Sequence, residues 1–233
     1  MPVHLYGQSC EMEQLHHVAS THNLIVIEDC AQSAGTKYKD EYTGTYGLAS
    51  AFSFYPTKNL GAAGDGGAIV TNDKDVYEKC LQLRNYGQSK KYYHDTEGIN
   101  SRLDEIQAAI LRVKLKHLEG WNARRREIAA IYRKKLTSVE CIRENSYGTP
   151  NYHLFVVKCR ERDRLIDHLS TKGIQALIHY PVPVNQQNAF PWQKAESFPA
   201  TVNLAAHVLS LPIYPELTNA EVESIISTVN GFR

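Results

Sequence analysis

Helical and extended apolar patterns alternate along the first third of the chain. Glu11 to His22 carries apolar residues at helical spacing, and the apolar run Leu24 to Ile27 that follows ends in two acidic residues. A short, continuous apolar run is typical of a strand buried on both faces, as in a parallel sheet. Ala51 to Tyr55 and Gly67 to Thr71 have the same extended character. The pattern predicts an α/β layer with polar residues where the strands end, which is where open α/β sheets bind ligands.

The second half of the chain predicts a long helix and then a smaller α/β unit. Residues 102 to about 136 keep a helical apolar spacing for most of their length, with an interruption at Glu119–Gly120. Because a long helix with a glycine break commonly joins two domains, we expect domains at residues 1–120 and 121–233. Thr218 to Glu221 has the spacing of a capping box and predicts the start of the final helix.

Charge and composition exclude several classes of protein. The chain has 233 residues, a net charge of +1 and no long basic run, so we expect no extended nucleic-acid surface. No apolar run approaches the roughly 20 residues that span a bilayer, and the first residues lack the pattern of a secretory signal. The five cysteines are scattered, without a C-x-x-C pair. This favours thiols in a reducing cytoplasm over a metal site or a disulfide framework.

The first segment with reactive residues runs from Ile27 to Ser33. Asp29 stands at the carboxyl end of the first expected strand, where its carboxylate is suited to pair with a protonated heterocyclic nitrogen. Gln32 is suited to donate a hydrogen bond nearby. Taken alone, the segment is explained as well by a helix cap or by the ribose-binding acid of a dinucleotide fold.

The second segment, Ser53 to Gly61, is followed by the glycine-rich run Gly64 to Gly67. Pro56 favours an extended turn after the strand, so we expect Lys58 to project from the edge of the sheet. Desolvation among small and apolar residues favours the neutral, nucleophilic form of a lysine, which imine formation with an aldehyde requires. Ser53 is suited to bind a phosphate. The alternative for Lys58 is an ordinary surface lysine in a loop.

The third segment runs from Gly98 to Gln107. We expect Asn100 or Ser101 to cap the long helix, whose first backbone amides attract anions. Capping alone would explain these residues without any further role.

These three segments belong to a longer series of short motifs. In chain order the series contains E-D-C-A-Q (28–32), S-F-Y-P-T-K-N-L-G (53–61), G-D-G-G (64–67), R-N-Y-G (84–87), G-I-N-S-R-L-D-E-I-Q (98–107), W-N-A-R-R-R-E-I-A (121–129), H-Y-P-V-P (179–183) and L-S-L-P-I-Y-P-E-L-T (209–218). In this order and spacing, the series resembles the DegT/StrS family of sugar-nucleotide aminotransferases. The resemblance covers essentially the whole chain. It implies a pyridoxal-phosphate (PLP)-dependent transferase of fold type I, aspartate aminotransferase-like, with 1–120 as the carboxyl-terminal part of the large PLP-binding domain and 121–233 as the small domain.

The resemblance also implies roles for single residues. Lys58 forms the Schiff base with PLP and acts as the general acid and base, and Asp29 pairs with the pyridinium nitrogen. Gln32 contacts the phenolic-oxygen side of the PLP ring, and Ser53 binds the cofactor phosphate. Asn100 reaches the cofactor phosphate that is bound in a neighbouring subunit. The last contact implies a homodimer. In the small domain, the resemblance places His179 and Tyr180 in the segment that approaches the substrate. It implies no metal.

The implied reaction transfers an amino group, usually from L-glutamate, to a nucleotide-linked keto-sugar in amino-sugar, polysaccharide or glycoconjugate biosynthesis. Two departures qualify it. Asn185 stands where the family commonly has a second histidine after H-Y-P-x-P, and the family normally has over a hundred residues before its P-V-H-L-Y-G. We therefore expect an amino-terminally truncated enzyme.

Three alternatives remain. The first is a non-catalytic remnant or partner subunit, the second a PLP-dependent sugar dehydratase, and the third a Rossmann dehydrogenase. Dehydratase relatives place histidine at the position of Lys58, and no G-x-G-x-x-G follows a strand, so both enzymatic alternatives fit less well.

Overall fold

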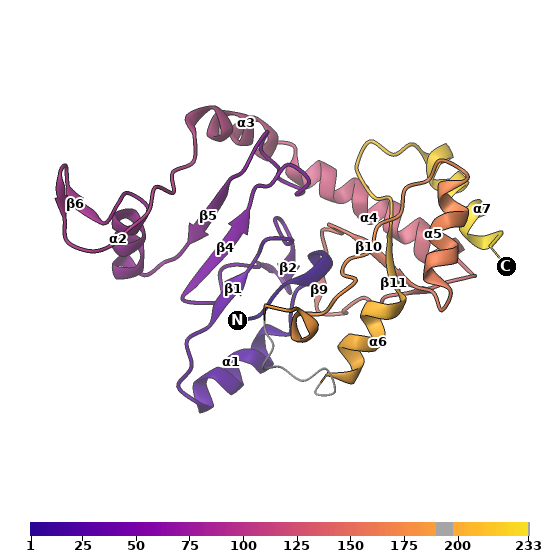
Figure 1. Cartoon of the computed structure of the whole chain (residues 1–233), viewed down its shortest axis with the longest axis horizontal. Helices are drawn as coiled ribbons and strands as arrows, with labels where there is room; N and C mark the ends of the chain where they lie inside the picture. Colours follow the sequence, from indigo (N-terminus) through magenta and orange to yellow (C-terminus); the bar gives the residue numbers. More distant parts are fainter. Residues whose placement is uncertain (190–197, 233) are drawn as a thin grey trace. The chain divides into compact units, whose positions relative to one another are not determined.

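The computed structural model describes residues 1–189 and 198–232. By their internal contacts these residues form two compact units (Figure 1). Unit 1 comprises Met1–Ala123 and Asn145–His153, and unit 2 comprises Arg124–Glu144 and Leu154–Arg233. Each unit is described by itself below. The domain assignment of 1–120 and 121–233 stays a prediction.

The main sheet of unit 1 has three strands in the order β1-β4-β5. They are β1 (Ile27–Asp29), β4 (Ala49–Ser53) and β5 (Gly67–Val70), which lie side by side in Figure 1. β1 and β4 are parallel, with Asp29 opposite Ala51, so their carboxyl ends lie at the same edge of the sheet. β5 is antiparallel to β4. The sheet therefore brings the end of β1 and the end of β4 together, as the sequence predicts, but it is mixed and not wholly parallel.

The other elements of unit 1 surround this sheet or extend from it. They are η1 (Leu5–Gly7), α1 (Met12–Thr21), β2 (Lys37–Tyr38), β3 (Glu41–Tyr42), α2 (Lys74–Leu83), β6 (Gln88–Lys90), β7 (Tyr93–His94), α3 (Glu105–Leu115) and β9 (Gly148–Thr149). β3, β2 and β9 form a second small sheet, and β6 pairs with β7. Helix α4 (Leu118–Lys135) begins in unit 1 and continues in unit 2.

The apolar run before Asp29 differs from its expectation. The strand begins only at Ile27, and Leu24 and Ile25 precede it. Their exposed fractions are 61% for Leu24, 70% for Ile25 and 45% for Ile27. A strand buried on both faces was therefore the wrong prediction. An apolar run shows which residues favour burial, but the packing partners decide whether burial occurs.

The long helical stretch also differs in its breaks. α3 ends at Leu115 and α4 starts at Leu118, whereas Gly120 lies inside α4 with open space around it. Glycine costs a helix only about 1 kcal/mol, so it does not have to end one. The helix begins after Asp104, not after Ser101. The backbone N–H of Ser101 instead donates to Arg84 O at 2.9 Å, which ties this segment to the end of α2.

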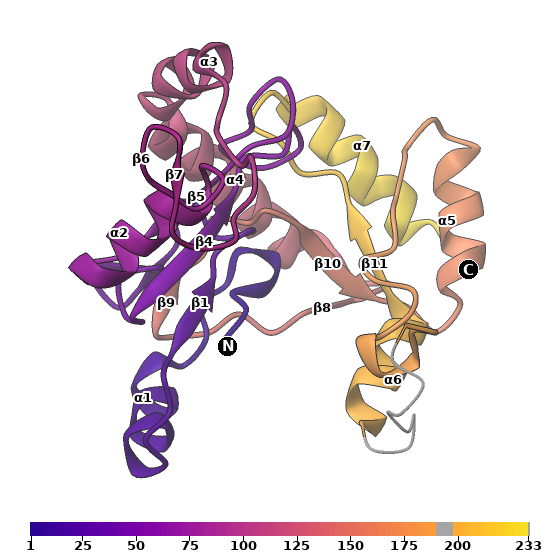
Figure 2. The same ribbon diagram turned by 60° about the vertical axis from the view of Figure 1, so that its left-hand side comes forward.

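Unit 2 is built on a three-stranded antiparallel sheet in the order β11-β10-β8. Its elements are the second part of α4, β8 (Glu140–Cys141), β10 (Phe155–Lys158), α5 (Arg162–Ser170), η2 (Val184–Gln186), α6 (Pro199–His207), β11 (Val208–Leu211) and α7 (Asn219–Asn230). α5 packs on α7 and on β11, and these elements are labelled in Figure 2.

The start of α7 confirms the expected capping box. Thr218 Oγ1 accepts a hydrogen bond from Glu221 N, and Glu221 Oε2 accepts one from Thr218 N at 2.8 Å. Each side chain thereby satisfies a backbone donor that the helix itself leaves without a partner. In residues 1–189 and 198–232, no helix is both long enough and apolar enough to cross a membrane.

Candidate active site

The loop that carries Lys58 is held firmly to the sheet. It starts at the end of β4, where Ala62 N donates to Phe54 O at 2.7 Å, and Lys58 N donates to Tyr55 O at 2.9 Å. A Cβ on Gly61 would lie 2.4 Å from Pro56 O, so only glycine lets the two ends of the loop approach this closely. Leu60 anchors the loop in an apolar cluster that also contains Ala62, Leu111 and Leu118.

Lys58 itself is half-buried. Burial lowers the pKa of its ammonium group, and the negative charge of Asp29 works in the opposite direction. Burial is the larger effect, so Lys58 loses its proton more readily than an exposed lysine does. The electrostatic effect of Asp29 also shows that the structure brings these two predicted residues within range of each other.

Asp29 is the last residue of β1, and Gln32 lies on the loop that follows. Asp29 Oδ1 accepts a hydrogen bond from Ala31 N at 2.9 Å, which fixes the side chain at the strand end. Gln32 Oε1 accepts from Tyr6 N at 2.6 Å. This bond fixes the position of the Gln32 amide on the loop.

Ser53 stands at the end of β4, opposite Gly67 of β5. Its hydroxyl oxygen accepts a hydrogen bond from Tyr55 N at 3.3 Å. A hydroxyl has one proton to donate, and this acceptor contact leaves that proton for another partner. Asp29, Gln32 and Ser53 are thus each oriented by a backbone N–H.

Asn100 lies apart from these residues in its contacts. It is exposed, its backbone pairs with Asn85, and its Oδ1 accepts from Arg102 Nε at 3.0 Å. Its hydrogen bonds therefore fix the segment before α3 and do not reach Lys58 within this chain.

His179 and Tyr180 belong to unit 2. His179 Nδ1 lies 2.8 Å from Oγ of the buried Ser210, which anchors the imidazole to β11. The His179 and Tyr180 rings pack edge to face with centroids 5.4 Å apart. Asn185, in the same segment, is buried. Their role towards a substrate stays a prediction.

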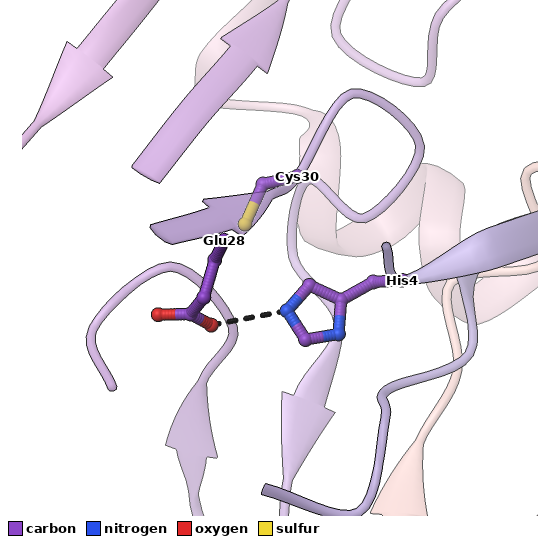
Figure 3. Close-up of side chains that lie close together, drawn as sticks. All are labelled: His4, Glu28 and Cys30. Atoms are coloured by element: carbon purple, nitrogen blue, oxygen red, sulfur yellow. Dashed lines mark hydrogen bonds and ion pairs between the residues drawn. The ribbon is translucent and has the colours of Figure 1, made fainter. Parts of the chain in front are cut away.

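A buried cluster lies on the other side of β1, where His4, Glu28 and Cys30 meet (Figure 3). Their potential ligand atoms lie within 4.8 Å of one another, a spacing that a metal ion could use. Glu28 Oε2 receives His4 Nε2 at 3.0 Å and Gly44 N at 2.8 Å. Its Oε1 receives backbone N–H groups at 2.8 and 2.7 Å, from Tyr46 and Gly47.

The second ring nitrogen of His4 is engaged as well, since Nδ1 accepts from Cys10 N at 3.1 Å. With Nδ1 as an acceptor, Nε2 carries a ring proton and donates it to Glu28. Both carboxylate oxygens and both ring nitrogens thus serve hydrogen bonds. Burial alone would raise the pKa of Glu28, but the bonds from His4 and from the backbone outweigh it and lower the pKa. The cluster anchors the turn before β4, and hydrogen bonding accounts for it without a metal.

Several residues around the site escaped the sequence analysis. His4 and Glu28 sit inside recognisable motifs, but nothing in the pattern shows that they pair. Asn59, Asn122, Asn151 and His153 also converge beside the Lys58 loop. Only the position of Asn59, directly after Lys58, could have pointed to it.

Comparison with known proteins adds to this geometry. The model of the DegT/DnrJ/EryC1/StrS aminotransferase family matches residues 1–230. The chain is 45% identical over 236 residues to the "erythromycin biosynthesis sensory transduction protein EryC1" of Saccharopolyspora erythraea, covering 99% of this chain and 64% of that protein. It is 47% identical over 240 residues to a dTDP-3-amino-3,6-dideoxy-alpha-D-galactopyranose transaminase of Aneurinibacillus thermoaerophilus, covering 100% of this chain and 64% of that protein.

A solved structure gives the same answer for the fold. The crystal structure of S. venezuelae DesV in complex with a ketimine intermediate matches with a TM-score of 0.94 and 44% sequence identity, covering 98% of this chain and 63% of that one. The chain thus spans less than two thirds of the length of the relatives it matches. The mixed α/β fold class expected from the sequence is confirmed.

Proposed function

The chain belongs to the DegT/DnrJ/EryC1/StrS aminotransferase family, and on this premise we propose that it acts in the PLP-dependent transfer of an amino group to a nucleotide-linked keto-sugar. The observation that carries the proposal is the electrostatic influence of Asp29, at the end of β1, on Lys58, in the loop after β4, where burial lowers the pKa of the lysine. L-Glutamate is the amino donor that the family resemblance implies. Relatives named as dTDP- and UDP-sugar transaminases support a nucleotide-linked sugar as the acceptor.

The residues present fit PLP chemically. An aldehyde needs an amine that loses its proton readily, and Lys58 is such an amine. A pyridinium nitrogen needs a carboxylate, and a phosphate needs a donor; Asp29 and Ser53 supply them. For Gln32, which Tyr6 N orients, we propose the contact with the phenolic-oxygen side of the ring that the family resemblance implies. These are the four positions that this chain contributes around one small, anionic heterocycle.

Each residue has a distinct task in the reaction. PLP, when bound, supplies a ring that withdraws electrons from the carbon that bears the amino group. Asp29 keeps the ring nitrogen protonated through its negative charge. Lys58 Nζ holds the cofactor and is also the group that accepts and returns a proton, a role for which its lowered pKa is suited. Ser53 orients the phosphate through its hydroxyl.

A second subunit completes the proposed site. We propose that Asn100, which is exposed, reaches the phosphate bound by a partner in a homodimer, as the family resemblance implies. His179 and Tyr180 are proposed to meet the sugar nucleotide. We place the protein in the cytoplasm, which its five free cysteines favour.

The test uses the full 233-residue chain with added PLP. We expect a visible absorption band that borohydride reduction fixes as a covalent adduct on Lys58, located by peptide mass spectrometry. Lys58→Ala should abolish the band. Lys37→Ala, at another half-buried lysine of unit 1, is the matched control and should leave it unchanged.

Two outcomes would count against the proposal. A folded chain that forms no adduct would refute PLP binding, and an adduct that survives Lys58→Ala would refute the role of this lysine. A chain that forms the adduct on Lys58 but transfers no amino group, alone or as a homodimer, would correspond to the partner subunit.

A further inference from the structure

Four polar side chains converge directly behind the Lys58 loop. Asn59 follows Lys58 in sequence, Asn122 comes from α4, and Asn151 and His153 come from the segment after β9. All four belong to unit 1. Asn122 and Asn151 are completely buried, Asn59 is nearly so, and His153 is half-buried. Burying several amides together is costly unless each of them is hydrogen-bonded.

The amides form a connected set of hydrogen bonds. Asn59 Nδ2 donates to Asn122 Oδ1 at 2.8 Å and to the backbone oxygen of Asn151 at 3.1 Å. Asn122 Nδ2 donates to Ala34 O at 3.0 Å. Asn151 Nδ2 donates to Ala34 O at 2.9 Å and to Gln32 O at 3.1 Å. The set therefore links the residue after Lys58 to the backbone of the loop that carries Gln32.

This arrangement also fixes the proton of His153. Because Asn59 Nδ2 faces two acceptors, the amide oxygen of Asn59 points to His153 Nδ1, 3.2 Å away. An amide oxygen can only accept, so Nδ1 of His153 carries a proton and donates it. The backbone N–H of His153 donates to Asn151 Oδ1 at 2.9 Å. His153 thus joins two members of the set at once.

Two glycines show how closely the surrounding chain is fitted to these amides. A Cβ on Gly7 would lie 1.9 Å from Asn151 Oδ1, and a Cβ on Gly35 would lie 2.5 Å from Asn122 Nδ2. Both glycines have positive φ, at 89° and 81°. The backbone at both places can approach the amides only because it has no side chain there.

We propose that Asn59, Asn122, Asn151 and His153 are positioning residues that lock the Lys58 loop to the Gln32 loop. This inference rests on the proposed function for the identity of the ligand. Lys58 and Gln32 meet different parts of PLP, so their loops must keep one fixed relation for both contacts to form together. Connected, hydrogen-bonded polar groups that are largely buried provide such a relation. The same lock keeps Lys58 in its partly desolvated place.

The variant that tests this is His153→Leu, which removes the donor to Asn59 Oδ1. His153→Asn is the conservative partner, because its Nδ2 is attached to Cγ as Nδ1 is in histidine and can donate in the same place. Tyr38→Phe is the stability control: it removes the buried bond between the Tyr38 hydroxyl and Glu11, within unit 1 but outside the network.

The first measurement needs no cofactor. Competitive acetylation of the full chain at a series of pH values, read by mass spectrometry, gives the pKa of Lys58. We expect His153→Leu to raise this pKa by about half a unit towards its ordinary value, because a loosened loop exposes the amine to water. His153→Asn should restore the original value, and Tyr38→Phe should leave it unchanged.

The second measurement is PLP affinity, followed by the visible band. We expect His153→Leu to weaken binding about tenfold, His153→Asn to restore it, and Tyr38→Phe to have no effect. The inference is overturned if His153→Leu leaves the Lys58 pKa unchanged, or if Tyr38→Phe shifts it equally. Failure of the unmodified chain to bind PLP would overturn the proposed function alone, since the acetylation experiment would still decide the network.

Discussion

Glu28 and Asp29 are neighbours on strand β1, yet their carboxylates have opposite surroundings. We call the side of β1 with Glu28 the structural face and the side with Asp29 the ligand-binding face. Glu28 is fully buried and receives four hydrogen bonds, one from His4 and three from backbone N–H groups. Asp29 is half-buried, receives one hydrogen bond from Ala31 N, and acts electrostatically on Lys58.

The difference separates a structural acid, Glu28, from Asp29, for which we propose ligand binding. A carboxylate has about four lone-pair positions, and those of Glu28 are occupied by the chain itself. Asp29 is oriented by a single bond, from Ala31 N, and keeps acceptor capacity for a ligand. Side-chain alternation along the strand makes this division possible, because successive residues point to opposite faces. One strand thus anchors the turn before β4 and presents the site.

The largest expected effect on stability follows from removing the carboxylate of Glu28. Glu28→Leu would leave His4 and three backbone N–H groups buried without their acceptor. Breaking a buried pair in this way costs about 3–5 kcal/mol, and we expect a loss of that size in the free energy of unfolding, measured in urea. Asp29→Asn keeps an oxygen for Ala31 N and should cost less than about 1 kcal/mol. Equal losses for both variants would remove the distinction between the two faces.

The ligand-binding face should show the reverse pattern. Asp29→Asn removes the charge that we assign to the pyridinium nitrogen, so PLP affinity should fall about tenfold or more, equivalent to at least about 1.4 kcal/mol. Because the charge of Asp29 raises the pKa of Lys58, the same variant should lower that pKa further. Titration with PLP and competitive acetylation measure the two effects. Unchanged affinity together with an unchanged Lys58 pKa would place Asp29 outside the site.

Sequence reasoning was effective where function depends on strand ends and less so where it depends on distant pairs. The end of β1 lies at Asp29 as expected, and β4 ends at Ser53, two residues before the expected end at Tyr55. The predicted start of the first strand, at Leu24, was wrong. The run Leu24–Ile27 shows apolar character but does not show which packing partners cover it.

The network behind Lys58 could not have been predicted in the same way. Asn59 and Asn151 are 92 residues apart, and asparagines on loops usually indicate only turns. Their meaning arises from the tertiary fold, which brings four polar side chains together and sets two of them, Asn122 and Asn151, against the carbonyl groups of one loop. Local patterns contain no signal for such an encounter.

Acid should weaken the structural face selectively. The pKa of Glu28 in the folded chain lies below its ordinary value of 4.5. The stabilisation is therefore fully present above about pH 4.5 and is lost as the pH falls through the folded-state pKa. Glu28→Gln cannot titrate, so its free energy of unfolding should fall less steeply in acid than that of the unmodified chain. Glu13→Gln, at an exposed position, is the control and should follow the unmodified chain. Parallel acid profiles for all three would contradict the prediction.

The smallest expected effect concerns the lysine itself. Burial lowers the pKa of Lys58, so a charged Lys58 costs the folded state stability at neutral pH. Lys58→Met should abolish the PLP adduct and yet raise the free energy of unfolding by a few tenths of a kcal/mol, the usual relation between a binding residue and stability.

Below the folded-state pKa of Lys58, the folded and the unfolded chain both bind the proton, and the full cost of the buried charge is present. As pH rises above that pKa, the folded lysine is neutral while the unfolded one remains protonated up to about 10.5, so stability increases with pH and the advantage of Lys58→Met shrinks. Urea midpoints at neutral and alkaline pH measure this trend. A variant that is less stable than the unmodified chain at neutral pH would show that Lys58 supports the fold. The residues proposed to bind the ligand would then also contribute to stability, as Glu28 does.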